Sequence, residues 1–241
     1  MPEGLSPQQL DELRKYDTPT ICNAIELFDV HPRNVGYMNQ IISACFPEMP
    51  PMVGYASTAT WRADAPAVDG REYGSIDAQV ESFAKIPGPP VVVFQDLDEP
   101  TAAASFGEVM CTTYKTFGAV GLVTSGAARD LDQVRAIGFP AFSNGVNPSH
   151  GYGHIVDVMI PVHVGGVTVL PGDLLHGDCN GVTTIPNAIA SELVDIVAEF
   201  VAAEEIVLDH LNSESPTVKG FAEARKAYKA VVDELTARVR K

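Results

Sequence analysis

The segment GEVMCTTYKTFGAVGLVTSGAARD, residues 107–130, joins a helical pattern to the pattern of a buried strand. Its first part predicts a helix that ends near Phe117, with Gly118 as the C-cap. Residues 118–124 are almost wholly apolar, which is typical of a strand that is buried on both faces. The strand leads into small residues and then into an Arg129-Asp130 pair.

The flanking segments repeat this alternation of strands and helices. Residues 87–96 (PGPPVVVFQD) hold a β-branched run between turn residues, which predicts a second buried strand. Further strands are expected at residues 53–61, where the pattern alternates, and at residues 139–142. Short helices are expected at residues 76–83 and 130–137. Strands that alternate with helices in this way favour parallel α/β structure.

The pattern changes in the second half of the chain. Residues 160–186 predict short strands, which are separated by turns at Gly165-Gly166, Pro171-Gly172-Asp173 and Asn180-Gly181. A long amphipathic helix is expected over residues 188–211, and a final helix follows the break at residues 213–220. Near the start, Asp17 is expected to cap a helix, and residues 30–51 form a long, proline-containing, irregular stretch.

The composition excludes several classes of protein. The 241 residues carry a formal net charge of −15, so no excess of Lys and Arg exists to neutralise phosphates, and binding to nucleic acid is not expected. The first residues hold no apolar signal core and no segment reaches transmembrane length, so we expect a cytoplasmic protein that does not enter a membrane. The four cysteines, Cys22, Cys45, Cys111 and Cys179, form no C-x-x-C motif and are expected to be reduced and mostly buried.

The Arg129-Asp130 pair is the strongest candidate for a binding site. Ligands of parallel sheets gather at the carboxyl ends of strands, and the two buried strands would bring residues 105–108 and this pair to one edge. Glu108 would begin a helix whose free N–H groups favour an anion, and Gly107 would let the backbone approach a ligand closely. An arginine fork, an aspartate for a hard cation and a second acid suit a small organic acid. The alternative is that Asp130 only caps the next helix.

Residues 107–186 resemble the family of 4-hydroxy-4-methyl-2-oxoglutarate/4-carboxy-4-hydroxy-2-oxoadipate aldolases, which also contains the regulator of ribonuclease activity A. The aldolase motif of that family is Gly, three residues, Asp, twenty residues and Arg-Asp. Residues 109–128 are the twenty that separate Glu108 from Arg129-Asp130, but Ala104 stands for the motif Gly and Glu108 for its Asp. The later PGD…D…GV…P run of the family is similar to Pro171-Gly172-Asp173, Asp178, Gly181-Val182 and Pro186.

The resemblance implies a role for three charged residues. Asp130 would ligate a Mg²⁺ or Mn²⁺ cofactor, largely through waters, as suits a hard cation. Arg129 would bind the 2-oxo acid end of the substrate and stabilise the negative charge on the enolate oxygen. Glu108 would organise a water for proton transfer.

The remaining contacts would come from the backbone and from a neighbouring subunit. The N–H groups of Val109 and Met110 would bind the substrate carboxylate, with Gly107 beside them. A glutamate from the C-terminal helix of a neighbour would complete the site, with Glu204 as the candidate and Glu205 as the alternative. The family forms trimers, or hexamers built from them, so a homotrimer or homohexamer is expected.

The resemblance as a whole implies a divalent-metal-dependent (class II) lyase that cleaves a small 4-hydroxy-2-oxo acid by a retro-aldol reaction and releases pyruvate. Oxaloacetate decarboxylation passes through the same enolate, so one site would support both reactions. The implied fold is a single α/β domain with α/β/β/α layers and mixed sheets, like the swivelling domains. It would span residues 1–211 and carry a C-terminal helical extension over residues 212–241, packed on the domain or on a neighbouring subunit. The alternative function is a non-catalytic regulatory protein like the ribonuclease regulator, but such regulators lack the acid that this chain keeps as Glu108.

Other polar residues are weaker candidates. His150 and His154 stand at i and i+4, which on a helix would suit zinc, but the glycines between them disfavour a helix and no third ligand is near. Their Gly-rich loop is instead expected to line the pocket or to form a turn. His163 and His176 are expected to be packing residues in strands, and Cys111 a buried thiol rather than a nucleophile.

Overall fold

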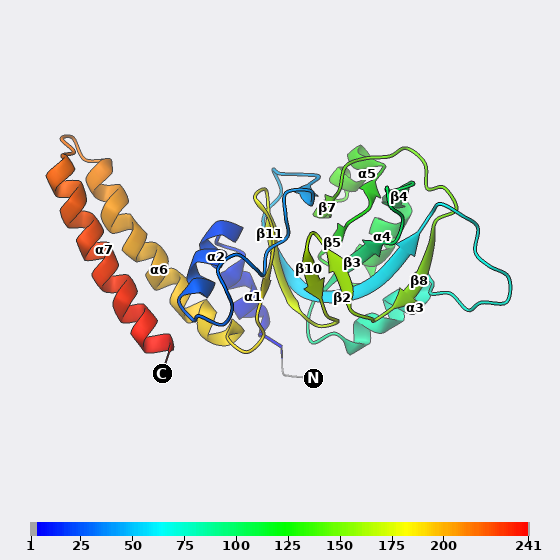
Figure 1. Cartoon of the computed structure of the whole chain (residues 1–241), viewed down its shortest axis with the longest axis horizontal. Helices are drawn as coiled ribbons and strands as arrows, with labels where there is room; N and C mark the ends of the chain where they lie inside the picture. Colours follow the sequence, from blue (N-terminus) through cyan, green and yellow to red (C-terminus); the bar gives the residue numbers. More distant parts are fainter. Residues whose placement is uncertain (1–3, 241) are drawn as a thin grey trace.

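The computed structural model describes residues 4–240, and its centre is a mixed sheet of eight strands. The strands of this sheet are β1 (Ser43–Ala44), β2 (Met52–Arg62), β3 (Pro90–Asp96), β5 (Gly121–Thr124), β7 (Ala141–Ser143), β8 (His154–Val158), β11 (Leu174–Asp178) and β12 (Gly181–Ile185). Their order is β1-β7-β5-β3-β2-β11-β12, and β8 pairs with β2 beside this path. The sheet curves into a nearly closed barrel with helices on its outside (Figure 1). The predicted class, an α/β fold with mixed sheets and a C-terminal helical tail, is confirmed.

The middle of the sheet is parallel, as the alternation of strands and helices predicted. Strand β3 pairs in parallel with β2 and β5, and β5 pairs in parallel with β7. The helices of this half, and the two that precede the sheet, are α1 (Pro7–Leu13), α2 (Thr18–Glu26), α3 (Ile76–Ser82), the 3-10 turn η1 (Phe83–Lys85), α4 (Glu108–Thr116) and α5 (Leu131–Ala136). The carboxyl ends of β3 and β5 consequently open toward the same region of the molecule, which contains the start of α4 and the start of α5 (Figure 1).

Strand β3 shows why its sequence is a continuous apolar run. Val91 and Val93 pack into the cluster inside the barrel, whereas Val92 and Phe94 pack into the cluster beneath the helices on the other side. All four are fully buried. The strand expected at residues 53–61 is confirmed as β2, and it is buried in the same way from Met52 to Trp61. Elements cover both faces of β2, and its alternation of large and small residues does not reflect contact with water.

The second half of the chain consists of short strands joined by tight turns, as predicted. Strands β9 (Val162–Val164) and β10 (Val167–Val169) form a hairpin, and β11 and β12 form another. The turns contain Gly165, Gly166, Gly172 and Gly181, all with positive φ. Four strands were not expected from the sequence: β1, β8, β4 (Ala104–Phe106) and β6 (Ala127–Ala128). Strands β4 and β6 form a small parallel pair beside the barrel. This pair lies directly before the two segments that the sequence marked as a candidate site.

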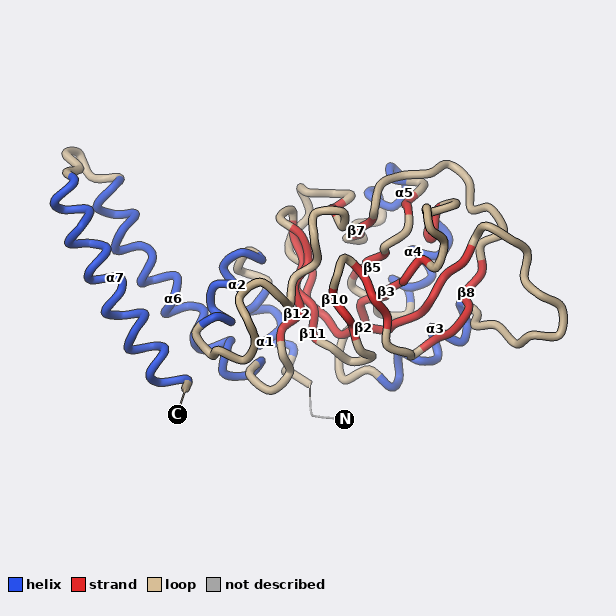
Figure 2. The backbone as a smooth tube through the Cα atoms, in the orientation of Figure 1, coloured by secondary structure: helices blue, strands red, loops and turns tan. Residues whose placement is uncertain are grey.

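The two long helices at the end of the chain form an antiparallel pair that extends away from the barrel (Figure 2). They are α6 (Ala190–Leu211) and α7 (Val218–Val239). Tyr228 of α7 meets Phe200 of α6 edge to face with ring centres 6.5 Å apart, and Leu235 is buried against the cluster of α1, α2 and α6. The tail therefore packs on α6 of its own chain. Within the described residues, no helix is both long enough and apolar enough to cross a membrane.

The buried pair of Tyr114 and Gln79 offers a test of the core. The Tyr114 hydroxyl donates to Oε1 of Gln79 at 2.7 Å, and both side chains are fully buried. In Tyr114→Phe the Gln79 oxygen loses its donor, so we expect the free energy of unfolding in urea to fall by about 1–3 kcal/mol. Tyr152→Phe is the matched control, because Tyr152 is 60% exposed. Equal stabilities for the two variants would contradict this account of the core.

Candidate functional site

The site begins at the first turn of α4, where backbone N–H groups have no helical acceptor. Gly107 is the N-cap residue and has no side chain to satisfy them. The N–H of Glu108 instead donates to Oδ2 of Asp130 at 3.0 Å. The N–H groups of Val109 and Met110 lie in the same first turn and remain available to a ligand. Helix α4 therefore presents a small anion-binding end, part of which Asp130 already occupies.

Asp130 is by position the N-cap residue of α5, but its side chain does not cap that helix. Its φ of 55° and ψ of 40° place it in the left-handed region, and its side chain makes no capping bond to α5. Aspartate tolerates this conformation better than most residues, but it is still uncommon. The alternative that Asp130 only caps the next helix is therefore wrong. Its carboxylate is directed to α4, the helix before it.

Arg129 and Asp130 lie side by side over Gly107. The Arg129 Nε is 3.8 Å from Oδ2 of Asp130, and the two side chains are 34% and 36% exposed. A Cβ atom on residue 107 would come within 2.5 Å of that Oδ2 and 2.9 Å of the Arg129 Nε. Only glycine fits at residue 107 without displacing the pair. The structure thus brings together Gly107, Glu108, Arg129 and Asp130, as the sequence predicted.

A small hollow of about 40 Å³ opens beside this pair. It is lined by Trp61, Ala104, Phe106, Gly107, Val109, Met110, Arg129 and His150. An arginine and the start of a helix thus border one concave surface, which is a suitable arrangement for a carboxylate. The chain as a whole carries a net charge of −15, so an anionic ligand depends on these local groups.

Buried polar residues support the loop that carries Arg129. The hydroxyls of Ser105 and Thr124 are 2.8 Å apart and fully buried between β4 and β5. Asp96, at the end of β3, accepts no hydrogen bond at its buried Oδ2 from the described residues, and burial raises the pKa of its carboxyl above the usual range. The Asp96 N–H donates to the Ser125 hydroxyl at 2.9 Å. Asp96 was not among the predicted site residues, although its place at the end of a buried strand was a usable signal.

Glu204 does not lie with the other candidates in this chain. It is on α6, and α6 extends from the side of the barrel opposite α4 and α5 (Figure 1). Burial raises the pKa of the Glu204 carboxyl, and the negative charge of Asp17 raises it further by a smaller amount. It borders an open groove of about 430 Å³ between α6 and α7, lined by Glu204, Val207, Leu208, Phe221, Arg225 and Tyr228. Glu205, the alternative, is exposed on the same helix.

The histidines and cysteines follow the predictions only in part. His150 borders the hollow and the segment from 150 to 154 forms no helix, as expected. His176 is buried with its Nδ1 2.9 Å from the Thr18 hydroxyl, whereas His163 is exposed, so its assignment as a packing residue is wrong. All four cysteines are free, but only Cys111 is fully buried and Cys179 is exposed, so the expectation of mostly buried thiols is also wrong. Both errors arise because the exposed residues lie on edge strands and turns.

The donor set at the site fits one kind of metal better than another. Within residues 4–240, no group of three or more His, Cys, Asp or Glu side chains is placed to hold a metal ion. A zinc site, which needs three or four such ligands, does not fit. Mg²⁺ and Mn²⁺ are hard ions, and Mg²⁺ commonly keeps several waters and uses only one or two carboxylates. The half-exposed Asp130 carboxylate fits that requirement.

The chain matches the RraA-like family, described as Aldolase/RraA, over residues 18–184. A protein of Halalkalibacterium halodurans named "Putative 4-hydroxy-4-methyl-2-oxoglutarate aldolase" is 36% identical over 104 residues, which cover 42% of this chain and 47% of that protein. Protein DlpA of Legionella pneumophila is 29% identical over 123 residues, half of this chain but only 20% of DlpA. The matched region thus spans half or less of these two relatives. A protein of Ectopseudomonas mendocina with the same aldolase name is 25% identical over 73% of this chain and 97% of its own length.

Two solved structures share the fold. An uncharacterised protein from Pseudomonas syringae superposes with a TM-score of 0.72 at 23% identity, over 93% of this chain and 95% of its own. RraAS2 of Streptomyces coelicolor, described as an unusual member of the RNase ES inhibitor RraA protein family, superposes with a TM-score of 0.68 at 23% identity. The superposition with RraAS2 covers 84% of this chain and 96% of that one. At this identity the likeness establishes the architecture only.

Alkylation of the cysteines tests whether Cys111 has a chemical role. Burial raises the pKa of the Cys111 thiol far above its ordinary value, and burial also raises the pKa of Cys22 and Cys45. We expect iodoacetamide at pH 8 to label Cys179 first and Cys111 last, as followed by mass spectrometry. In guanidinium chloride all four should react at similar rates. Fast labelling of Cys111 in the folded protein would restore it as a candidate nucleophile.

Proposed function

The chain belongs to the RraA-like family, and on that premise we propose that it is a lyase that cleaves a small 4-hydroxy-2-oxo acid by a retro-aldol reaction and releases pyruvate. One observation carries the proposal: Arg129, Asp130 and the open first turn of α4 converge on one hollow. The aldolase names of two relatives support the reaction class. Oxaloacetate decarboxylation, which forms the same enolate, is a second reaction of the same site.

Arg129 and the start of α4 would bind the 2-oxo acid end of the substrate. The planar guanidinium matches a carboxylate with two parallel hydrogen bonds. The N–H groups of Val109 and Met110 would hold a carboxylate oxygen, assisted by the partial positive charge of the helix end. Because these donors are fixed by α4, they would need little reorganisation as charge develops on the enolate.

Asp130 is the residue that would hold a divalent cation, Mg²⁺ or Mn²⁺. Its Oδ2 accepts the Glu108 N–H, and its other oxygen makes no hydrogen bond with the described residues. When bound, such a cation supplies a Lewis acid that polarises the ketone of a 2-oxo acid. The left-handed conformation of Asp130 is of the strained kind that often occurs at functional sites.

Proton transfer is the role we assign to Glu108. The reaction needs a base for the C4 hydroxyl and an acid that protonates C3 after the bond breaks. Glu108 is exposed at the first position of α4, and its backbone is tied to Asp130. A glutamate in place of aspartate extends the carboxylate by roughly 1.5 Å, which is large enough to change substrate choice or rate.

We further propose that a second copy of the chain supplies Glu204, in a cyclic homotrimer or homohexamer. The position of α6, away from α4 within one chain, leaves a neighbour as the source of this residue. The competing function is a non-catalytic regulatory protein. The carboxylates at residues 108 and 130, together with Arg129, are the features that favour catalysis.

Replacement of Asp130 tests the proposed function. We expect metal-dependent pyruvate release to fall by more than about 100-fold in Asp130→Asn, since even outer partners of metal sites contribute about 10–100-fold. Asparagine tolerates the left-handed conformation and keeps an oxygen for the Glu108 N–H, so the fold should persist. Asp130→Ala removes that oxygen as well and should also lose about 0.5–2 kcal/mol of stability. Wild-type turnover in either variant, or turnover that EDTA does not affect, would contradict the proposed role of Asp130.

Subunit mixing tests the origin of Glu204. Asp130→Ala and Glu204→Ala should each be inactive, but random mixing should restore about one quarter of the wild-type activity, because half of the sites receive an intact Asp130 and half of those an intact Glu204. Glu205→Ala is the matched control and should be active alone. A monomer in solution, or no recovery after subunit exchange has been demonstrated, would exclude the shared site. An inactive Glu205→Ala beside an active Glu204→Ala would assign the role to Glu205.

A further inference from the structure

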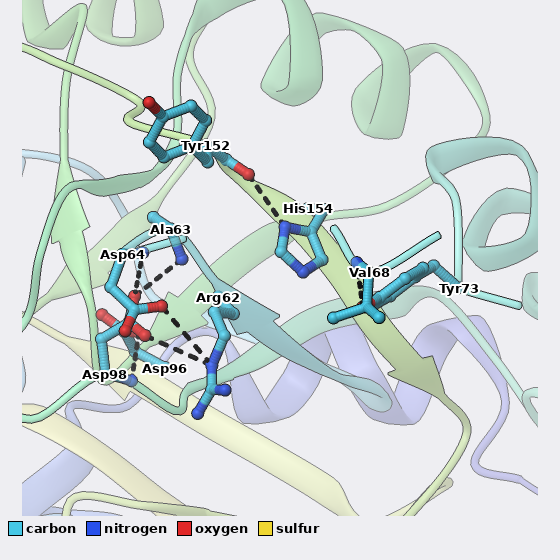
Figure 3. Close-up of polar contacts among 9 residues, drawn as sticks. All are labelled: Arg62, Ala63, Asp64, Val68, Tyr73, Asp96, Asp98, Tyr152 and His154. Atoms are coloured by element: carbon cyan, nitrogen blue, oxygen red, sulfur yellow. Dashed lines mark hydrogen bonds and ion pairs between the residues drawn. The ribbon is translucent and has the colours of Figure 1, made fainter. Parts of the chain in front are cut away.

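Arg225, on α7, differs from every other arginine of the chain. The other eight each have an acidic side chain at 2.5–3.9 Å. Arg62, for example, pairs with Asp98 at 3.4 Å and with Asp64 at 3.7 Å (Figure 3). Arg225 has no such partner among residues 4–240, although the sequence holds 31 Asp and Glu residues, and its guanidinium lies over the Phe221 ring. A cation in this position suits an acidic group of a second molecule.

Arg225 borders the open groove of about 430 Å³ between α6 and α7, together with Glu204. The rest of the lining consists of Val207, Leu208, Phe221 and Tyr228. No residue from 204 to 231 is buried, and the structure describes this whole segment. Two paired helices that extend away from the barrel leave part of their apolar stripe uncovered, and Leu208 is 52% exposed (Figure 2). The groove thus combines apolar walls with one acidic and one basic side chain, as a docking surface does.

The start of α4 presents a complementary surface. Val109, Thr113 and Thr116 stand at i, i+4 and i+7, so they form one stripe along the helix, and Val109 is 76% exposed. Each threonine hydroxyl donates at 2.8 Å to the carbonyl four residues before it, so the stripe presents mainly methyl groups. Beside the stripe lie Arg129 and the exposed Glu108, whose carboxylate makes no hydrogen bond or ion pair with the described residues. This surface also combines an apolar stripe with one acid and one base.

We propose that the groove docks on the start of α4 in a neighbouring copy of the chain, and that Arg225 pairs there with Glu108 of the neighbouring copy. The inference rests on the proposed function, in which Glu204 reaches the neighbouring hollow. Glu204 and Arg225 border one groove, so a contact that brings one of them to the hollow brings the other. The charges are complementary, because Glu204 approaches the cation of Arg129 while Arg225 approaches the anion of Glu108. The apolar walls of the groove cover Val109.

The two surfaces are different parts of one chain, so the contact is head-to-tail. The hairpin of α6 and α7 extends from the side of the barrel opposite α4 (Figure 1). Head-to-tail contacts close into a ring of copies, which agrees with the proposed cyclic oligomer. Each Glu108 of the ring then receives one Arg225. The ion pair orients the Glu108 carboxylate, which is exposed within a single chain, so Arg225 is a positioning residue for the proposed proton transfer.

Exchange of the two charges tests the pair, with sedimentation velocity at a series of protein concentrations as the readout. In Arg225→Glu two acidic side chains face each other, so we expect the concentration at which half of the oligomer dissociates to rise at least about tenfold. Glu108→Arg should have the same effect. The double variant restores an opposite pair and should assemble at close to the wild-type concentration. Both side chains are exposed in the single chain, so neither change disturbs the core.

Two further variants serve as controls. Lys226→Glu changes the net charge by the same amount at the next position of α7, where the lysine is also exposed. It should change assembly little, and it should not rescue Glu108→Arg. Arg225→Lys keeps the cation and should keep most of the assembly, although it loses the planar fork.

Wild-type assembly in Arg225→Glu, a double variant that is as dissociated as the single ones, or equal rescue of Glu108→Arg by Lys226→Glu would each overturn the contact. A monomeric wild-type protein would overturn it as well. Failure of the proposed function appears differently, because assembly is measured without turnover. Selective rescue in a protein that releases no pyruvate from 4-hydroxy-2-oxo acids would remove the lyase and keep the contact. Pyruvate release by the wild-type protein without selective rescue would keep the lyase and remove the contact.

Discussion

One hydrogen bond, from the backbone N–H of Glu108 to the carboxylate of Asp130, joins the two segments on which the site depends. It satisfies a helix start that Gly107 leaves uncapped, and it directs the Asp130 carboxylate toward α4 rather than α5. The positive end of the helix stabilises the negative charge there. Arg129 directly precedes Asp130 in the chain and therefore lies at the same point. Without this bond, the Asp130 carboxylate would not be directed to the start of α4.

The strands of the barrel hold both segments in place, so one hydrogen bond is enough to orient the Asp130 carboxylate. The parallel pairing of β3 with β5 fixes the ends of both strands, and the small β4–β6 pair brings residues 104–106 and 127–128 side by side. The loop after β5 consists of small residues. One of them, Gly126, lies so close to the Asp96 carboxylate and the Ser105 hydroxyl that a side chain would collide with them. Rigid strands thus position a binding surface made of loops. In a chain with a net charge of −15, the local arginine and helix end are what would attract an anionic substrate.

Local patterns predicted the parts of this structure that local chemistry determines. The apolar run of β3, the start of α4 at Glu108 and the glycine turns of the second half follow from periodicity and from backbone conformation. The meeting of residues 105–108 with Arg129-Asp130 was predicted, but the hydrogen bond from the Glu108 N–H to Asp130 was not, because it depends on side-chain and backbone orientations that the curvature of the whole sheet sets. The place of Trp61 in the lining of the hollow could not be predicted for the same reason. From the sequence Trp61 looks like a core residue of β2, and only the tertiary structure places it with His150 in that lining. The placement of α6 relative to α4 likewise depends on tertiary packing and not on helical propensity.

The central claim is that the Asp130 carboxylate and Arg129 form one site for a divalent cation and a 2-oxo acid. A crystal structure of the protein with Mg²⁺ and pyruvate tests it most directly. We expect the cation within coordination distance of Asp130 or of its waters, and the pyruvate carboxylate between Arg129 and the first turn of α4. If the two ligands bind elsewhere, or if pyruvate occupies the hollow with no cation near Asp130, the account is wrong.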